Sequence, residues 1–104
     1  MKYESVFAPG ADRTLRKIRA YDRVVVFDAI ERHLRHEPVK RSRSRIKRLR
    51  DLRHSQYRLR IGDLRVFYDV TPKQVGIVAV VRKSEAAEWL ARWGIRNEKE
   101  GGSL

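Results

Sequence analysis

Three strand-like runs lie close together between residues 56 and 81, and they constrain the fold more than any other feature. The runs Gln56–Ile61 and Leu64–Val70 flank Gly62-Asp63, a pair typical of a tight β-hairpin. A third run, Gln74–Val81, is rich in β-branched residues and follows the turn Thr71-Pro72-Lys73. Connections this short cannot form a crossover, so neighbouring strands must run antiparallel. The sequence therefore predicts a small twisted antiparallel sheet.

The residues before this sheet predict one further strand and two helices. Lys2–Ala8 alternates loosely and reads as a strand that Pro9-Gly10 ends. A short helix is expected over Asp12–Ile18, with Asp12 as its N-cap. A longer helix is expected over Asp22–His36, with Asp22 as its N-cap, because its apolar residues recur at helical spacing and Pro38 follows.

The segments on either side of the hairpin region are less uniform. Residues 40–53 are strongly basic with few apolar residues, and they fit either a turn of helix or an irregular edge of the sheet. Ser84 can cap a last helix, which Gly94 would end. We therefore predict an α+β domain of residues 1–96, followed by a flexible tail over residues 97–104. Its two N-terminal helices cover one face of the sheet, and the C-terminal helix lies at the edge of the sheet.

Composition excludes several classes of protein. The 104 residues include no cysteine, so disulfides and zinc–thiolate sites are excluded. The longest uncharged apolar stretch, Val75–Val81, is far shorter than the ~20 residues of a membrane span. His33 and His36 are three residues apart on one helix, but no third metal ligand accompanies them. A cytoplasmic protein without metal or cofactor is expected.

The charge of the chain points to a polyanionic partner. Lys and Arg number 25 against 13 Asp and Glu, a net charge of +12. Eleven of the basic residues fall between Lys40 and Arg65, where Asp51 and Asp63 are the acidic residues. A concentration of this kind is typical of nucleic-acid binding, because Lys and Arg neutralise phosphates. An acidic protein segment could cover the same surface through charge complementarity.

Alternation along the hairpin separates its residues into two faces. Tyr57, Leu59 and Ile61 share the apolar face that the helices require, so Arg58 and Arg60 point the other way. Arg65 and Phe67 on the second strand fall on the same side as these two arginines. We therefore expect an open face on which guanidinium groups bind phosphate and aromatic rings stack on bases. The candidate RNA-binding residues are Lys40, Arg43, Arg45, Lys47, Arg48, Arg50, Arg53, Phe67, Lys83 and Trp89.

The run YRLRIGDLRVFYDV, the strand IVAVVRK and the two preceding helices resemble the RelE/ParE toxin superfamily of bacterial toxin–antitoxin systems. The resemblance covers roughly residues 2–93. It implies a microbial ribonuclease-like fold and a metal-independent endoribonuclease that cuts mRNA on the ribosome, inhibits translation and is held inactive by a cognate antitoxin. By position, Arg58, Arg60, Arg65 and Arg82 match the catalytic basic residues of RelE-like toxins, with Lys83 as the less favoured match for Arg82.

Two departures from the RelE pattern leave alternatives open. RelE-like toxins often have a late tyrosine suited to proton transfer, whereas the nearest aromatic residue here is Trp89, which can stack but cannot exchange a proton. Arginine is a poor general base at neutral pH, so His54 is the candidate base near the hairpin. The alternatives are a ParE-like toxin that inhibits DNA gyrase by binding, and a nucleic-acid-binding module without catalysis.

Overall fold

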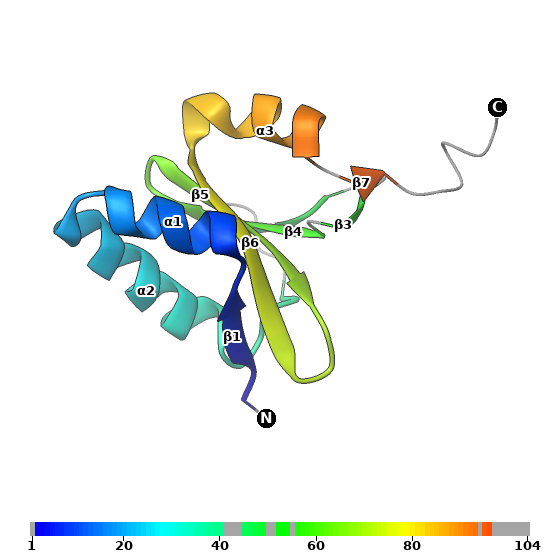
Figure 1. Cartoon of the computed structure of the whole chain (residues 1–104). Coiled ribbons are helices and arrows are strands. Elements are labelled where there is room, and N and C mark those ends of the chain that lie inside the picture. The colour runs from blue at the N-terminus through cyan, green and yellow to red at the C-terminus, as the bar shows by residue number, and fades with distance from the viewer. Residues whose placement is uncertain (1, 41–44, 50–51, 55, 94, 97–104) are drawn as a thin grey trace, which may run out of the picture.

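A computed structural model describes residues 2–40, 45–49, 52–54, 56–93 and 95–96. The chain has an α+β arrangement, as predicted, in which two helices follow the first strand and five strands then follow each other (Figure 1). The elements are β1 (Glu4–Phe7), α1 (Pro9–Lys17), α2 (Ala20–Leu34), β2 (Ile46–Arg48), β3 (Leu52–His54), β4 (Tyr57–Ile61), β5 (Leu64–Val70), β6 (Gln74–Arg82), a 3-10 turn η1 (Lys83–Glu85), α3 (Ala86–Trp93) and β7 (Ile95–Arg96).

Both N-terminal helices begin earlier than the sequence suggested. Pro9 is in the first turn of α1, where its missing N–H costs nothing, and Asp12 lies inside that turn rather than at the cap. Asp22 likewise lies in the first turn of α2, where its carboxylate is favourable near the positive end of the helix dipole. The predicted capping roles of Asp12 and Asp22 are therefore wrong, although both helices exist and end before Pro38.

The main sheet has five strands in the order β1-β6-β5-β4-β2. The strands β4, β5 and β6 pair antiparallel, as predicted, and Gly62 forms the first hairpin turn at φ +54°. In contrast, β1 pairs parallel with β6, so the sheet is mixed. Between β1 and β6 the chain passes through α1, α2 and β2 to β5, so this pairing is non-local and the local pattern of residues 2–8 does not encode it.

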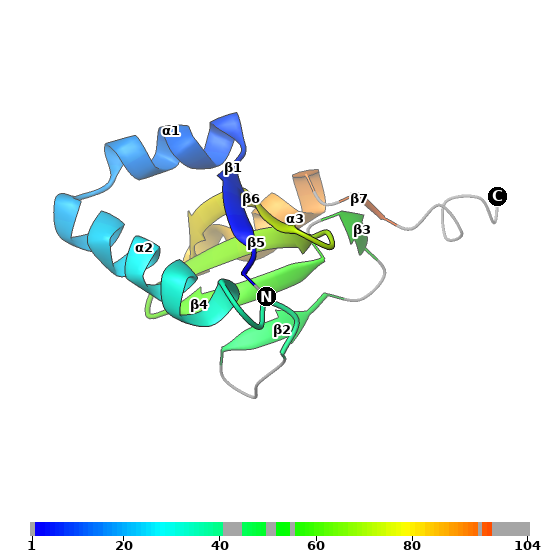
Figure 2. The same ribbon diagram turned by 90° about the horizontal axis from the view of Figure 1, so that it is seen from below.

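The main core lies between the sheet and α1 and α2, which cover one side of the sheet in both views (Figures 1 and 2). Leu59, Val66, Tyr68 and Ile77 point into it and are fully buried. The predicted apolar face of the hairpin is therefore confirmed. We call this side the inner face of the sheet and the opposite side the outer face.

The outer face is partly covered by α3, and here the prediction was wrong. Leu49, Phe67 and Ala79 form a second buried cluster, against which Trp89 and Leu90 of α3 pack. The last helix therefore lies on the outer face rather than at the edge of the sheet. Its apolar side, with Ala86, Trp89 and Leu90 at helical spacing, needs an apolar partner, and the outward-facing Phe67 provides it.

The basic segment forms an edge strand. Within it, β2 pairs antiparallel with β4, with Ile46 opposite Leu59 and Lys47 opposite Arg58. Ile46 is buried in the main core, and that one apolar residue fixes which side of β2 faces inward. Farther along, β3 pairs with β7 in a separate two-stranded sheet. Among the described residues, no helix has the length and apolar character needed to cross a membrane.

Candidate nucleic-acid interface

Four cations share the outer face of β2, β4 and β5. Lys47 stands opposite Arg58 across β2 and β4, and Arg60 stands opposite Arg65 across β4 and β5. Residues paired in this way project to the same face, so the four side chains form a compact block. Lys47 and Arg60 are exposed, Arg58 is half-buried, and Arg65 is only 6% exposed. We call Lys47, Arg58, Arg60 and Arg65 the outer-face cations.

Arg65 is a buried charge held by backbone carbonyls. Its Nη1 donates to the carbonyl oxygens of Gly62 and Leu64, each at 2.9 Å. Burial lowers the pKa of Arg65, the charges of Arg58 and Arg60 lower it further, and Asp63 opposes the shift in part. Among the described residues, none of the three arginines forms an ion pair. A bound anion would therefore offset both the desolvation of the buried charge and the repulsion from Arg58 and Arg60.

Arg58 offers an unused hydrogen-bond donor. Its Nε is buried without a hydrogen-bond partner within the described part of the chain. Buried donors are normally paired, and one left unpaired costs on the order of 1–3 kcal/mol. Together with the carbonyl-anchored guanidinium of Arg65, it forms a positively charged site with spare donors. Phosphate oxygens match such a site, because a guanidinium can bind them in a bidentate manner.

Phe67 and Trp89 do not form an open stacking platform. Their rings stack on each other, with centroids 4.8 Å apart and an interplanar angle of 9°. Phe67 is fully buried, so its predicted contact with RNA bases is wrong for this arrangement. The physical reason is that α3 buries its own apolar face against the same ring. The pair instead belongs to the small apolar cluster, next to Arg58, which stands opposite Phe67 across β4 and β5.

Arg82 lies at the end of β6, beside the hairpin turn. It stands opposite Leu64, whose side chain belongs to the inner face, and its Nη1 is 3.6 Å from the carboxylate of Asp63. Arg82 therefore has a nearby counter-charge, and that same Asp63 also acts on Arg65 at the hairpin turn. Lys83 follows in η1, and its backbone N–H donates to the carbonyl of Asp63 at 2.8 Å.

The other predicted RNA-binding residues are dispersed. Arg48 lies over the ring of Tyr57 and donates to the carbonyls of Leu49 and Gln56, which is a structural role. Lys40 and Arg45 line a cavity beside α2. Arg43 and Arg50 lie outside the described residues, as do the side chains of Arg53 and His54, whose backbone is in β3. A base role for His54 therefore stays a prediction.

The described carboxylates near this surface include Glu85 and Glu88, which line a cavity with Trp89 of α3, and two aspartates of the hairpin. Asp63 lies in the hairpin turn, and Asp69 accepts a hydrogen bond from the backbone N–H of Gln56 at 2.7 Å. Tyr68 faces the main core, where burial raises the pKa of its hydroxyl far above the usual value. Within the described ranges, no group of three His, Asp or Glu side chains could hold a metal ion. The described surface is suited to binding and neutralising a phosphate.

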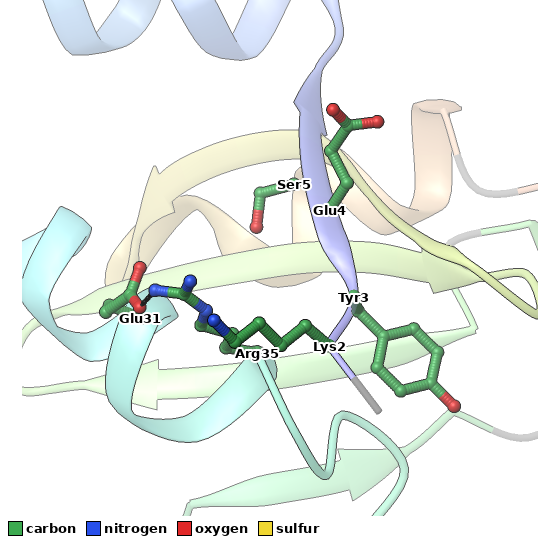
Figure 3. Close-up of a pocket in the computed structure, with 6 residues that line it drawn as sticks. All are labelled: Lys2, Tyr3, Glu4, Ser5, Glu31 and Arg35. Atoms are coloured by element: carbon green, nitrogen blue, oxygen red, sulfur yellow. Dashed lines mark hydrogen bonds and ion pairs between the residues drawn. The ribbon is translucent and has the colours of Figure 1, made fainter.

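A separate cavity of about 430 Å³ lies beside β1 and the end of α2. Figure 3 shows its lining residues, among which Arg35 points towards Glu31 and forms an ion pair with it. That pairing neutralises the guanidinium, and Lys2 and Glu4 add one charge of each sign. This cavity therefore lacks the excess of positive charge found on the outer face.

Comparisons with known proteins agree with the architecture. The family model of the ParE toxin of type II toxin–antitoxin systems, parDE, matches residues 6–87. No curated protein matches the chain. The toxin–antitoxin complex RelBE2 from Mycobacterium tuberculosis contains a chain with a TM-score of 0.67 and 24% identity, over 79% of this chain and 99% of that chain.

Two archaeal structures share the same fold. The RelE–RelB complex from Pyrococcus horikoshii OT3 gives a TM-score of 0.60 at 25% identity, over 80% of this chain and 97% of that chain. The RelB–RelE complex from Methanococcus jannaschii gives a TM-score of 0.62 at 18% identity, over 81% of this chain and 96% of that chain. The family match spans most of the chain, and the resemblance seen in its hairpin is thereby confirmed. The chain belongs to the ParE toxin family, within the RelE/ParE superfamily, and is the toxin of a type II toxin–antitoxin system.

Proposed function

We propose that this toxin acts on RNA: the outer-face cations bind the backbone of mRNA on the ribosome and promote its cleavage, which stops translation. The observation that supports the proposal is the block of Arg58, Arg60 and Arg65, which contains one buried guanidinium and one unused buried donor without a described carboxylate partner. Folding alone would favour paired or absent charges at such positions. An RNA phosphate would supply the missing negative charge.

The proposed reaction needs charge stabilisation and two proton transfers. The ribose 2′-oxygen forms a bond to the adjacent phosphorus while the bond from phosphorus to the 5′-oxygen breaks. A base takes the 2′-hydroxyl proton and an acid protonates the leaving 5′-oxygen, giving a 2′,3′-cyclic phosphate and a 5′-hydroxyl. Arg65 is fixed by two carbonyls and would stabilise the charge that grows on the phosphorane, with Arg58 and Arg60 beside it. His54 is the proposed base.

We also propose that an acidic antitoxin neutralises this toxin by covering the outer-face cations. The three similar structures are toxin–antitoxin complexes. A net charge of +12, concentrated before and within the hairpin, favours a partner segment rich in Asp and Glu. Both the RNA target and the antitoxin would place the toxin in the cytoplasm.

Inhibition of DNA gyrase is the second candidate function. It is favoured by one observation: the matching family model is that of ParE toxins. A toxin that acts by binding alone needs no general acid or base. The same cations would then contact a protein or DNA surface.

The two candidates are separated by measuring cell-free translation and gyrase supercoiling with the same preparations. We expect the wild-type chain to block translation and to leave supercoiling intact. Arg60→Gln should weaken the block about 10²–10³-fold, the range for losing one preorganised donor to a developing oxyanion. Arg13→Gln, which removes an exposed charge on α1, is the matched control and should behave as wild type. Inhibited supercoiling with normal translation would establish the second candidate instead.

A further inference from the structure

A cavity of about 360 Å³ lies between the end of α2 and β2, around the sheet edge from the outer-face cations. Its size is within the range of about 300–1,000 Å³ common for small-molecule sites. The buried side chain of Ile46 forms an apolar part of its wall. Its polar lining consists of Arg32, His33, His36, Glu37, Lys40 and Arg45.

The lining carries an excess of positive charge. Its described lining contains the cations Arg32, Lys40 and Arg45 and the carboxylate of Glu37, which is 3.8 Å from Lys40 Nζ in an exposed pair. Arg32 also forms an ion pair with Asp28, which lies outside the cavity lining, with 3.1 Å between Arg32 Nη2 and Asp28 Oδ2. Exposed pairs of this kind are weak and exchange readily with other anions. The cavity therefore offers cations and two imidazoles to an anionic ligand.

These positive charges affect the pKa of His33. Burial lowers the pKa of its imidazole, Arg45 and Arg32 lower it further, and Asp28 opposes them. The free imidazole is thus neutral at pH 7. An anion bound between these groups would offset the repulsion and favour the protonated ring. The charged and titratable groups around His33 are Asp28, Arg32 and His36 on the α2 side, Glu37 and Lys40 in the following segment, and Arg45 before β2.

Arg45 connects the cavity to the outer face. Its carbonyl oxygen accepts the backbone N–H of Arg60 at 2.8 Å, while its side chain lines the cavity. Lys47, two residues later, belongs to the outer-face cations and stands opposite Arg58. Positive charge therefore continues from the outer face around the β2 edge to the α2 end without a described carboxylate on β2.

We propose that this cavity is a second phosphate subsite, which holds a phosphodiester of the same RNA strand where the strand turns around the β2 edge, with His33 protonated in the bound state. The inference rests on the proposed action on RNA. It adds a path for the RNA strand, which runs from the outer-face cations past Arg45 to His33 and Lys40. It also makes RNA binding proton-linked, because the strand binds more tightly to the protonated imidazole.

The first test is an NMR titration of the His33 imidazole in the full chain. The probe is a short single-stranded RNA with 2′-O-methyl riboses, which cannot be cleaved through the 2′-hydroxyl. We expect this RNA to raise the pKa of His33 by about one unit, as an anion within 4–6 Å does. An unchanged pKa would overturn the inference, and so would a shift caused by inorganic phosphate but not by RNA. A shift caused by an acidic antitoxin peptide alone would assign the cavity to the antitoxin.

The second test is the salt and pH dependence of RNA affinity. Lys40→Gln should reduce the slope of log Kd against log salt by about 0.7, the value for one phosphate contact on single-stranded nucleic acid. Lys17→Gln removes one exposed charge from α1 and is the control, with the slope of the wild type expected. His33→Gln should reduce the gain in affinity that the wild type shows as the pH falls, because His36 is then the imidazole that remains in the cavity.

The outcomes separate this inference from the proposed function. If Arg60→Gln weakens RNA binding while Lys40→Gln and His33→Gln leave its salt and pH dependence unchanged, the subsite is wrong and the outer-face function stands. If Lys40→Gln and Lys17→Gln reduce the slope equally, the attraction is diffuse and there is no subsite. If the wild-type chain does not bind RNA, both proposals fail.

Discussion

At the scale of single residues, Arg65 combines burial with the absence of a described carboxylate partner. Its donors reach two carbonyls, yet Arg58 and Arg60 repel its charge from the neighbouring strand. The sequence predicted the arginines correctly as neighbours, because alternation places Arg58, Arg60 and Arg65 on one face. It did not predict the burial of Arg65, which depends on how its side chain folds back onto the hairpin turn.

Replacing Arg65 with methionine should separate stability from function. Methionine fills similar space and removes a poorly compensated buried charge, so the free energy of unfolding should stay within about 1 kcal/mol of wild type or rise. Translation inhibition should be lost. Urea unfolding and cell-free translation measure the two effects. A large loss of stability in Arg65→Met would show that the arginine is structural.

Tyr68, in contrast to Arg65, is expected to contribute to stability and not to activity. Its hydroxyl donates to the carbonyl of Pro38 at 2.7 Å, and its side chain is fully buried. Tyr68→Phe should therefore lower the free energy of unfolding by about 1–2 kcal/mol without changing activity at equal folded concentration. A loss of activity in Tyr68→Phe that is larger than its unfolded fraction explains would contradict this assignment.

The same tyrosine predicts a dependence on alkaline pH. Burial, and to a smaller degree Tyr57, raise the pKa of Tyr68 in the folded state, whereas the unfolded chain ionises near pH 10. Above pH 10 the folded state holds the extra proton, so stability falls as the pH rises, by up to about 1.4 kcal/mol per pH unit. Tyr68→Phe should show a shallower decline above pH 10 in chemical denaturation. An identical decline would mean that other groups cause it.

At the scale of elements, α3 is the part that sequence reasoning placed least well. The spacing of Ala86, Trp89 and Leu90 indicated an amphipathic helix, but not which surface it covers. Phe67 was the available signal, since an aromatic residue on the outer side of a central strand needs a cover. The sequence left the β2 segment open between a turn of helix and an edge of the sheet, because its pairing with β4 is non-local and its composition is dominated by cations.

The stacked ring pair predicts how α3 is held. Trp89→Ala removes the partner of Phe67 and should lower the free energy of unfolding by about 2–3 kcal/mol. Trp93→Ala is the matched control, because Trp93 is 62% exposed, and its effect should stay within about 0.5 kcal/mol. Urea denaturation followed by circular dichroism measures both. Equal effects of the two substitutions would show that α3 is not anchored through Phe67.

At the scale of the whole molecule, the sheet separates two apolar clusters of unequal size. The large cluster on the inner face joins α1 and α2 to all of the central strands, and the small one on the outer face involves α3. The α+β class, the hairpin and the inner core follow from alternation and helical spacing. The parallel pairing of β1 and the cover over Phe67 require long-range contacts that no local pattern contains.

The outer-face cations lie beside the small cluster on the outer face, and the central proposal is that they act on RNA. The most direct test is to map the ends of mRNA recovered from a translating extract treated with the toxin. We expect fragments that end in 2′,3′-cyclic phosphate and 5′-hydroxyl with the wild-type chain and with Arg13→Gln, and far fewer of them with Arg60→Gln. Intact mRNA in an extract that contains folded toxin, together with inhibited gyrase supercoiling, would contradict it.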